Sequence, residues 1–539
     1  MKRVVRAVFA VAIAVGCGSL WADGAAKWTL TLSSATAGKI EDGVDAFNVS
    51  LTAGSDALSV TELYTAKSAT LDLAKPIEDE DGKVYRLTAV TRKYATANSV
   101  VTEVRLPETM TTLDSNAFAN FTSLVKVDPF LPDSVVTINA SAFSGCSKLS
   151  GCCRFSNPNL KALGNSAFSR CAKLQEIDFT GCGLESMGEL CFRECTSLTN
   201  IVNAFPPTFK SFTTGRCFYS CSALKCSLKF TNPEFTSVPY DMFNGAKILS
   251  VDFGDCPIAE IGQNAFNNCT TLTNITPLLP GTVTTIGASA FYGCPLAGDL
   301  IATNPALKTI GSSAFQQTKI SSVRFAEEGL ETISQRAFRG ITTLTNMVPF
   351  LPRTVKTIGD RSFYETTNLK IELDASSGGM VSTLAAAAFY SSGITGANFG
   401  NSEVTTIVSD SPFNNESGMK WIVFPKNIST IVGAVSIDAL TNMTFVGKPP
   451  ESIAANAFKC SSSYAMKRVI CVPRAYKDEW ESFFRAGGYN VQPLMAEERT
   501  SFRQLFPGAK VPRQKVKLAS SYYQYLAYTG NLGFMLLVR

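Results

Sequence analysis

The sequence predicts a repeat solenoid, a right-handed β-rich coil with a small β cap at its N-terminal end. A short frame ending in Ala-Phe returns at intervals of 23 to 26 residues over most of the 539-residue chain. Each copy also holds a stretch in which Leu, Ile or Val alternates with polar residues, as in a strand buried on one face. The 36 phenylalanines, against 15 tyrosines and 4 tryptophans, indicate one structural position that is used many times.

The repeat frame is clearest in two segments, residues 135–146 (VVTINASAFSGC) and 283–294 (VTTIGASAFYGC). Weaker copies at 85–95, near Ser436 and at Phe458 bring the expected number of turns to 15 or 16. Stacked turns should align the frame phenylalanines in a continuous inner column. These are Phe118, Phe143, Phe168, Phe192, Phe218, Phe243, Phe266, Phe291, Phe315, Phe338, Phe363, Phe389 and Phe413.

The IGxxAFxxC cores, such as residues 286–294, and the LPxTV lead-ins at Leu279 and Leu351 resemble the BspA-type leucine-rich repeats. The resemblance covers roughly residues 84 to 475. It implies a leucine-rich-repeat solenoid of about 23 residues per turn, of the kind found in bacterial and protist surface proteins. It also implies attachment or ligand binding at the cell surface.

A longer period is superimposed on the short one. Proline-containing lead-ins at Pro132, Pro207, Pro280 and Pro352 follow one another at 75, 73 and 72 residues. Three turns therefore form a higher unit of about 73 residues, which indicates tandem duplication of a three-turn block.

The N-terminus reads as an export signal. Lys2, Arg3 and Arg6 precede an apolar run too short to span a bilayer, and we place cleavage after Ala22, so that residues 1–22 form a signal peptide. The alternative is a lipoprotein signal in which Cys17 carries the lipid anchor. Either signal predicts an exported protein at the cell surface or in the extracellular space.

The remaining boundaries follow from changes in pattern. Residues 23–83 predict a β-rich cap that shields the first coil, and 84–475 the solenoid. Residues 476–495 predict a closing segment, and 496–539 a separate basic and aromatic tail. For the tail, a terminal β-hairpin and a sorting or attachment signal both remain open. No segment is apolar for long enough to form a transmembrane helix.

Composition excludes several functions. The chain has no histidine, which removes His-dependent catalysis and His-ligated metals. Between residues 23 and 495 there are 39 basic and 42 acidic residues, so the body lacks the excess of basic charge expected of a nucleic-acid binder. No carboxylate pair stands out as an acid/base couple, and no CxxC pair suggests zinc. We therefore expect no enzyme, cofactor or metal.

Cysteine is the remaining reactive residue. Six of the 16 cysteines lie three residues after a frame Phe: Cys146, Cys171, Cys195, Cys221, Cys269 and Cys294. A fixed place in the coil predicts buried free thiols that pack as small apolar groups. Disulfides between neighbouring coils are the alternative in an exported protein.

Candidate binding residues flank the buried position of the predicted strands, where alternation directs their side chains away from the core. They are Asp128, Asp178, Asn200, Asp252, Asn274, Arg324 and Asn346. A regular polar ladder suits an extended partner, and we expect an adhesin-like protein that binds another extracellular protein. The alternatives are a glycan-binding accessory protein and a cell-envelope structural protein. Trp421 is the only Trp in the repeats, which weighs against a glycan.

Overall fold

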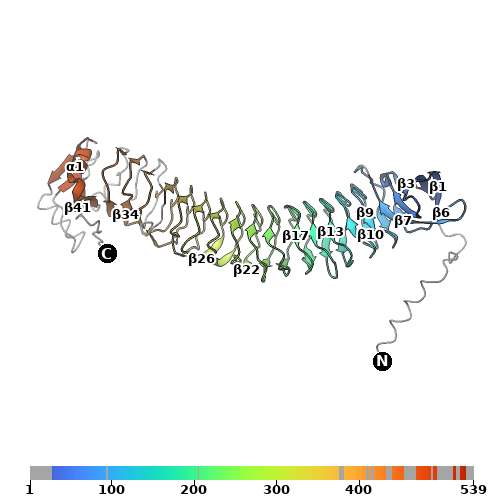
Figure 1. Cartoon of the computed structure of the whole chain (residues 1–539). Helices are drawn as coiled ribbons and strands as arrows, with labels where there is room; N and C mark the ends of the chain where they lie inside the picture. The colour runs from blue at the N-terminus through green and yellow to red at the C-terminus, as the bar shows by residue number, and fades with distance from the viewer. Residues whose placement is uncertain are drawn as a thin grey trace, which may run out of the picture.

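The computed structural model describes residues 27–92, 95–203, 205–374, 381–407, 412–413, 418–432, 440–453, 469–486, 490–493, 514–517 and 523–529. The predicted signal peptide, with Cys17, lies outside the described residues, as do the weak repeat copies near Ser436 and at Phe458. The chain forms a long, gently curved β-solenoid (Figure 1) of about 14 turns. The expected 15 or 16 turns included those two weak copies.

The N-terminal end is closed by the expected β cap. Strands β1 (Trp28–Ser34), β2 (Ala37–Glu41), β3 (Ala46–Leu51) and β4 (Ala57–Val60) form an antiparallel meander, and β6 (Ile77–Asp79) pairs with β1. Trp28 is fully buried against Phe47, at 5.6 Å between ring centroids. Strand β4 pairs in parallel with β7 (Val84–Val90), and β7 pairs with the first short strand of the solenoid. The cap therefore continues the solenoid without a linker.

Each turn contributes a long strand to one side of the solenoid. Every pairing between these long strands is parallel. The long strands are β5 (Thr70–Asp72), β8 (Glu103–Arg105), β10 (Lys126–Asp128), β12 (Gly151–Arg154), β14 (Leu174–Asp178), β16 (Asn200–Val202), β18 (Ser227–Lys229), β20 (Ser250–Asp252), β22 (Asn274–Thr276), β24 (Ala297–Ala302), β26 (Lys319–Phe325), β28 (Asn346–Val348), β30 (Glu372–Asp374), β32 (Gly396–Asn398), β34 (Trp421–Phe424), β36 (Asn442–Phe445) and β38 (Val469–Pro473).

A second side carries a column of two-residue parallel strands, formed by the Thr-Ile part of the frame. These short strands are β9 (Thr112–Leu113), β11 (Thr137–Ile138), β13 (Ala162–Leu163), β15 (Ser186–Met187), β17 (Ser211–Phe212), β19 (Ser237–Val238), β21 (Glu260–Ile261), β23 (Thr285–Ile286), β25 (Thr309–Ile310), β27 (Thr332–Ile333), β29 (Thr357–Ile358), β31 (Thr383–Leu384), β33 (Thr406–Ile407), β35 (Thr430–Ile431) and β37 (Ser452–Ile453).

The third side consists of stacked turns that hold the Ala-Phe part of the frame. Backbone N–H groups of one turn donate to carbonyls of the next, as from Phe291 to Ala314 at 2.9 Å. Each turn needs two residues with positive φ, such as Ser289 at 54° and Gly293 at 70°. Behind them the 13 frame phenylalanines form the predicted continuous column, with neighbouring ring centroids 5.2 to 5.8 Å apart.

The long-strand ladder is interrupted every three turns, after β10, β16, β22 and β28. In an uninterrupted turn, the residue after the strand donates its N–H to the next coil, as from Phe253 to Thr276 O at 2.9 Å. Pro129, Pro277 and Pro349 occupy this position after β10, β22 and β28, and proline has no N–H to donate. The three-turn sequence unit is thus visible as sheets of three strands.

One interruption affects both ladders. Between the turn of β16 and β17 and the turn of β18 and β19, neither the long nor the short strands pair. In the short column, a frame glycine donates to the preceding coil, as from Gly262 to Val238 O at 2.8 Å, whereas Pro239 at the equivalent position cannot. The hydrogen bonds of the third side continue across this interruption, because Phe218 donates its backbone N–H to Met242 O at 3.1 Å. Among the described residues, no other pair of neighbouring turns lacks both ladders.

The C-terminal end carries the single described α-helix, α1 (Lys477–Ala486). Its Trp480 is buried against Phe445 at 4.7 Å and donates its indole N–H to Gly447 O at 3.1 Å. Strands β39 (Asn490–Pro493), β40 (Gln514–Lys517) and β41 (Tyr523–Thr529) extend the long-strand sheet beyond β38. Strands β40 and β41 pair as an antiparallel hairpin, the first of the two expectations for the tail.

Candidate binding face

The long strands present two columns of side chains on their outer face. In the long strands from β8 to β30 a central residue is buried and its two neighbours lie on the outer side; in β22, Ile275 is 4% exposed while Asn274 and Thr276 are exposed. We call the position before the buried residue the first column and the position after it the second column. Parallel pairing keeps each column in register from turn to turn within a sheet.

The structure places all seven predicted binding residues in these two columns. Asn200, Asn274 and Asn346 belong to the first column, and Asp128, Asp178, Asp252 and Arg324 belong to the second. Six of them lie in pairs on neighbouring strands of three different sheets: Asp178 with Asn200, Asp252 with Asn274, and Arg324 with Asn346. They therefore share one face without converging on one point.

The prediction that Asp178 faces solvent is wrong, because this side chain is only 12% exposed. Its Oδ1 accepts the backbone N–H of Thr180 at 2.8 Å, and its Oδ2 lies 3.3 Å from Arg154. Burial raises the pKa of Asp178, but the hydrogen bonds from Thr180 and the charge of Arg154 outweigh that effect, so the pKa lies below its ordinary value. Asp178 ends its strand in a side-chain-capped turn.

The other two aspartates are also engaged locally. Asp252 accepts the backbone N–H of Gly254 at 2.9 Å, which repeats the turn at Asp178. Asp128 is exposed and accepts a hydrogen bond from the ammonium of Lys126 at 2.7 Å, and this contact lowers the pKa of Asp128. These carboxylates are thus largely used by the solenoid itself.

Between β16 and β28 the first column consists almost entirely of short polar side chains. Its members in order are Asn200, Ser227, Ser250, Asn274, Asp299, Ser322 and Asn346. We call the six Asn and Ser residues of this set the Asn/Ser column. The three serines were missed from the sequence, although each directly precedes a buried Leu or Val of a strand, which is a usable signal.

Charges in the second column are mostly neutralised by ion pairs. Arg105 lies 3.6 Å from Asp72, Arg154 lies 3.3 Å from Asp178, and Lys229 lies 4.0 Å from Asp252. Arg324 is exposed and has no ion pair or side-chain hydrogen bond within the described part of the chain. The face therefore lacks a strong field of one sign.

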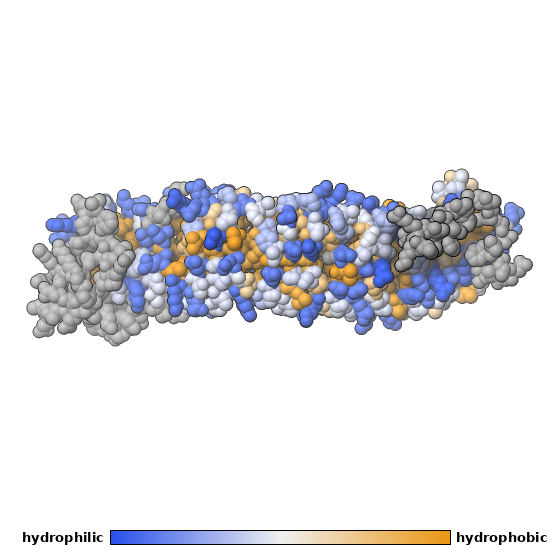
Figure 2. Space-filling view, turned by 90° about the horizontal axis from the view of Figure 1, so that it is seen from below, coloured by the Kyte–Doolittle hydropathy of each residue, from blue (hydrophilic) through white to orange (hydrophobic). Residues whose placement is uncertain are grey.

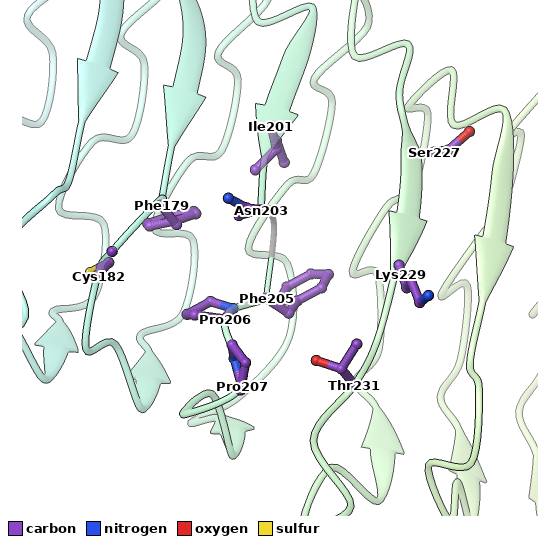
Figure 3. A pocket seen from close by; sticks show the side chains of 11 residues that line it. Phe179, Cys182, Ile201, Asn203, Phe205, Pro206, Pro207, Ser227, Lys229 and Thr231 are labelled. Carbon is purple, nitrogen blue, oxygen red and sulfur yellow. The ribbon is translucent and has the colours of Figure 1, made fainter.

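A groove opens where both ladders are interrupted. It has a volume of about 590 Å³ and an apolar floor that includes Phe179, Phe205 and Pro206. Figure 3 shows Phe205 and Pro206 on the β16 side of the gap, and Lys229 and Thr231 on the β18 side.

On the flank seen in Figure 2, apolar residues form a broken band along the middle of the solenoid, between polar margins. Apolar area is thus accessible at several points along the molecule.

All 14 described cysteines are free, as predicted, and all but Cys152 are buried. The six frame cysteines donate their thiols to the carbonyl of a frame Phe in the preceding coil, at 2.9 to 3.3 Å. Burial raises the pKa of the Cys146 thiol to about 12. These thiols act as packing groups with weak hydrogen bonds, not as nucleophiles.

Among the described residues, no three Cys, Asp or Glu side chains gather closely enough to hold a metal ion. Within the same parts of the chain, no helix has the length and apolar character needed to cross a membrane.

Comparison with known proteins identifies a family. Residues 90–225, 214–298, 259–373 and 349–465 match the BspA type leucine-rich repeat region, and together they cover more than half of the chain. No curated protein matches the sequence.

Several solved structures have a similar fold. A leucine-rich repeat protein from Bacteroides ovatus is 20% identical with a TM-score of 0.47, covering 75% of this chain and 94% of its own. A leucine-rich cell surface protein from Faecalibacterium prausnitzii is 17% identical with a TM-score of 0.38, covering 76% and 94%. The pneumococcal vaccine antigen PcpA is 16% identical with a TM-score of 0.35, covering 82% and 96%.

Proposed function

The chain belongs to the BspA-type leucine-rich repeat family, and from that membership we propose that it is an exported, non-enzymatic surface protein whose long-strand face binds another extracellular protein. Export is supported by the basic and apolar N-terminal segment that contains Lys2, Arg3 and Arg6. Anchoring through Cys17 is the variant of this proposal in which the protein stays attached to a membrane surface.

The Asn/Ser column is the observation that carries the proposal. Six of the seven first-column residues on the outer face of β16 to β28 are short and uncharged, and Asp299 is the exception. Short side chains lose little conformational entropy when a partner covers them, and amides and hydroxyls adapt as donors or acceptors. Ordinary solvated strand surface would carry more long charged side chains, which resist burial. This composition favours a protein partner that lies along the solenoid.

A catalytic function receives no support from the same face. The carboxylates of the second column are held in strand-ending turns or ion pairs, as at Asp178 and Asp252. A hydrolytic acid/base pair needs two carboxyl groups on either side of a substrate-sized cleft. The groove of about 590 Å³ described above has Lys229 as its one charged lining residue, and a smaller hollow beside β12 and β14 is lined by one carboxylate, that of Glu176.

A glycan partner is the alternative. Aromatic platforms for sugars need an open ring face, and Trp421 is the one described tryptophan on the long strands. Its ring packs over Gly396, where no room is left for a Cβ, and its indole N–H lies 3.4 Å from Glu372. One face of this ring is therefore already used within the protein.

The proposal is tested by binding of the full chain to arrays of extracellular matrix proteins and of glycans. Ser250→Arg places a long charged side chain in the Asn/Ser column and should weaken protein binding by about tenfold or more, or ~1.4 kcal/mol. Thr270→Arg, on the exposed third side, is the matched control and should change binding less than about twofold. Binding to glycans alone, or equal effects of both variants, would contradict the proposal.

A further inference from the structure

One row of the binding face differs from the rest. Ile301 of β24, Arg324 of β26 and Val348 of β28 pair in register and lie side by side in the second column. Ile301 is 50% exposed and Val348 is 51% exposed. No other large aliphatic side chain of the described long strands β8 to β38 reaches this exposure. The sheet of β24, β26 and β28 therefore displays two apolar side chains with an arginine between them.

Among the described long strands, Arg324 is also the one cation of the second column that has no carboxylate within ion-pair distance. Its counterparts Arg105, Arg154 and Lys229 each have a carboxylate within 4.0 Å. The carboxylate of Asp299, whose strand position pairs with Ser322, attracts Arg324 from beyond ion-pair distance, while its oxygens are engaged by serine hydroxyls. It accepts the hydroxyls of Ser321 and Ser322 at 3.1 and 2.6 Å, and these bonds lower the pKa of Asp299.

We propose that Ile301, Arg324 and Val348 anchor an extended protein segment that presents a carboxylate between aliphatic or aromatic side chains. This inference rests on the proposed function, because it names the chemistry by which the long-strand face would recognise its partner. A guanidinium binds a carboxylate through two parallel N–H···O bonds, a geometry that an ammonium cannot reproduce.

The two aliphatic neighbours give the ion pair its strength. An exposed ion pair contributes little because water screens it. Apolar groups of the partner that cover Ile301 and Val348 would exclude water from Arg324 on both sides, which is the arrangement found around energetically dominant interface arginines. The adjoining first-column residues Ser322 and Asn346 supply hydrogen bonds at the edge of the same contact.

The test is selection of a random 12-residue peptide display library on the full chain, followed by affinity measurement of the selected peptides. The expected peptides carry Asp or Glu flanked by apolar residues. Arg324→Gln should weaken their binding by at least about tenfold, and Ile301→Ser or Val348→Ser by about fivefold each. Arg154→Gln, which removes a paired arginine of the same column, is the matched control and should change affinity less than about twofold. Thermal unfolding of each variant verifies the fold.

Charge reversal gives an independent readout. Selection on Arg324→Glu should enrich Lys or Arg at the position where the unmodified chain enriches Asp or Glu. Peptides without carboxylates, equal affinity for the Arg324→Gln variant, or a library without binders would overturn the inference. If Ser250→Arg weakens partner binding but Arg324→Gln does not, the anchoring role fails while the proposed function stands; if neither does, both fail.

Discussion

The phenylalanine column predicts how much the free energy of unfolding falls when Phe291 is replaced. This residue is fully buried, and its ring stacks on Phe266 at 5.5 Å and on Phe315 at 5.4 Å. Phe291→Leu keeps much of the apolar volume but removes both stacking contacts, each of which contributes about 0.5–1.5 kcal/mol. We expect a loss of about 1–3 kcal/mol. Phe291→Ala also opens a cavity, and the expected loss is about 3–5 kcal/mol.

The effect should be local as well as large, because each coil of a solenoid contacts only its neighbours. Hydrogen exchange of the full chain should show lost protection in the turns of Phe266, Phe291 and Phe315 and unchanged protection near the cap. Urea unfolding followed by circular dichroism measures the free-energy change. Tyr292→Leu, a half-exposed neighbour, is the control and should stay within about 0.5 kcal/mol. A loss below about 1 kcal/mol for Phe291→Ala would refute the stacked column.

Three further predictions follow from the described contacts. Alkylation of the native protein should modify Cys152 alone among the described cysteines. The reaction should be slow at pH 8, because partial burial raises the pKa of Cys152 to about 11, and its rate, read by peptide mass mapping, should rise about tenfold per pH unit up to that pKa. Modification of the frame cysteines at a similar rate would contradict their burial. Asp178→Asn should lower the free energy of unfolding by about 1–2 kcal/mol at pH 7. Because the pKa of Asp178 is depressed in the fold, the difference in stability between the two proteins should be complete above pH ~4 and disappear as acid titrates the folded carboxylate. A pH-independent difference would contradict this role of the Asp178 carboxylate. Amide protection should be lowest, among the turns from β14 to β22, around residues 205–213 and 231–239, where both ladders are interrupted; uniform protection across these turns would show that the third side alone holds them.

The sequence predicted the fold well because one period of the sequence corresponds to one coil of the solenoid, so equivalent residues stack on one another. The frame phenylalanines recur once per coil, and only a stack of coils brings such residues into one buried column. The three-turn period was also visible in the lead-in prolines such as Pro132 and Pro280. The prolines that interrupt the long-strand ladder, Pro129, Pro277 and Pro349, were not singled out, because their effect depends on the residue after each strand donating its N–H to the next coil.

The binding face was predicted in part. Alternation correctly placed Asn274, Asn346 and Arg324 on the outer side of their strands. It failed for Asp178, because a carboxylate at the end of a strand can turn back and accept the N–H of Thr180. Alternation reports the side of a strand, whereas exposure also depends on what the following turn does with the side chain.

The sequence by itself thus determined the coil, its buried column and its outward strand positions, because these repeat within a single turn. Only the tertiary structure decided which outward groups have partners, as the coils vary in length and register between turns. Arg154 meets Asp178 of the next coil, while Arg324 meets Val348 and remains unpaired. Whether a charge is neutralised depends on a neighbour one coil away, and stacking of the coils alone brings that neighbour into reach.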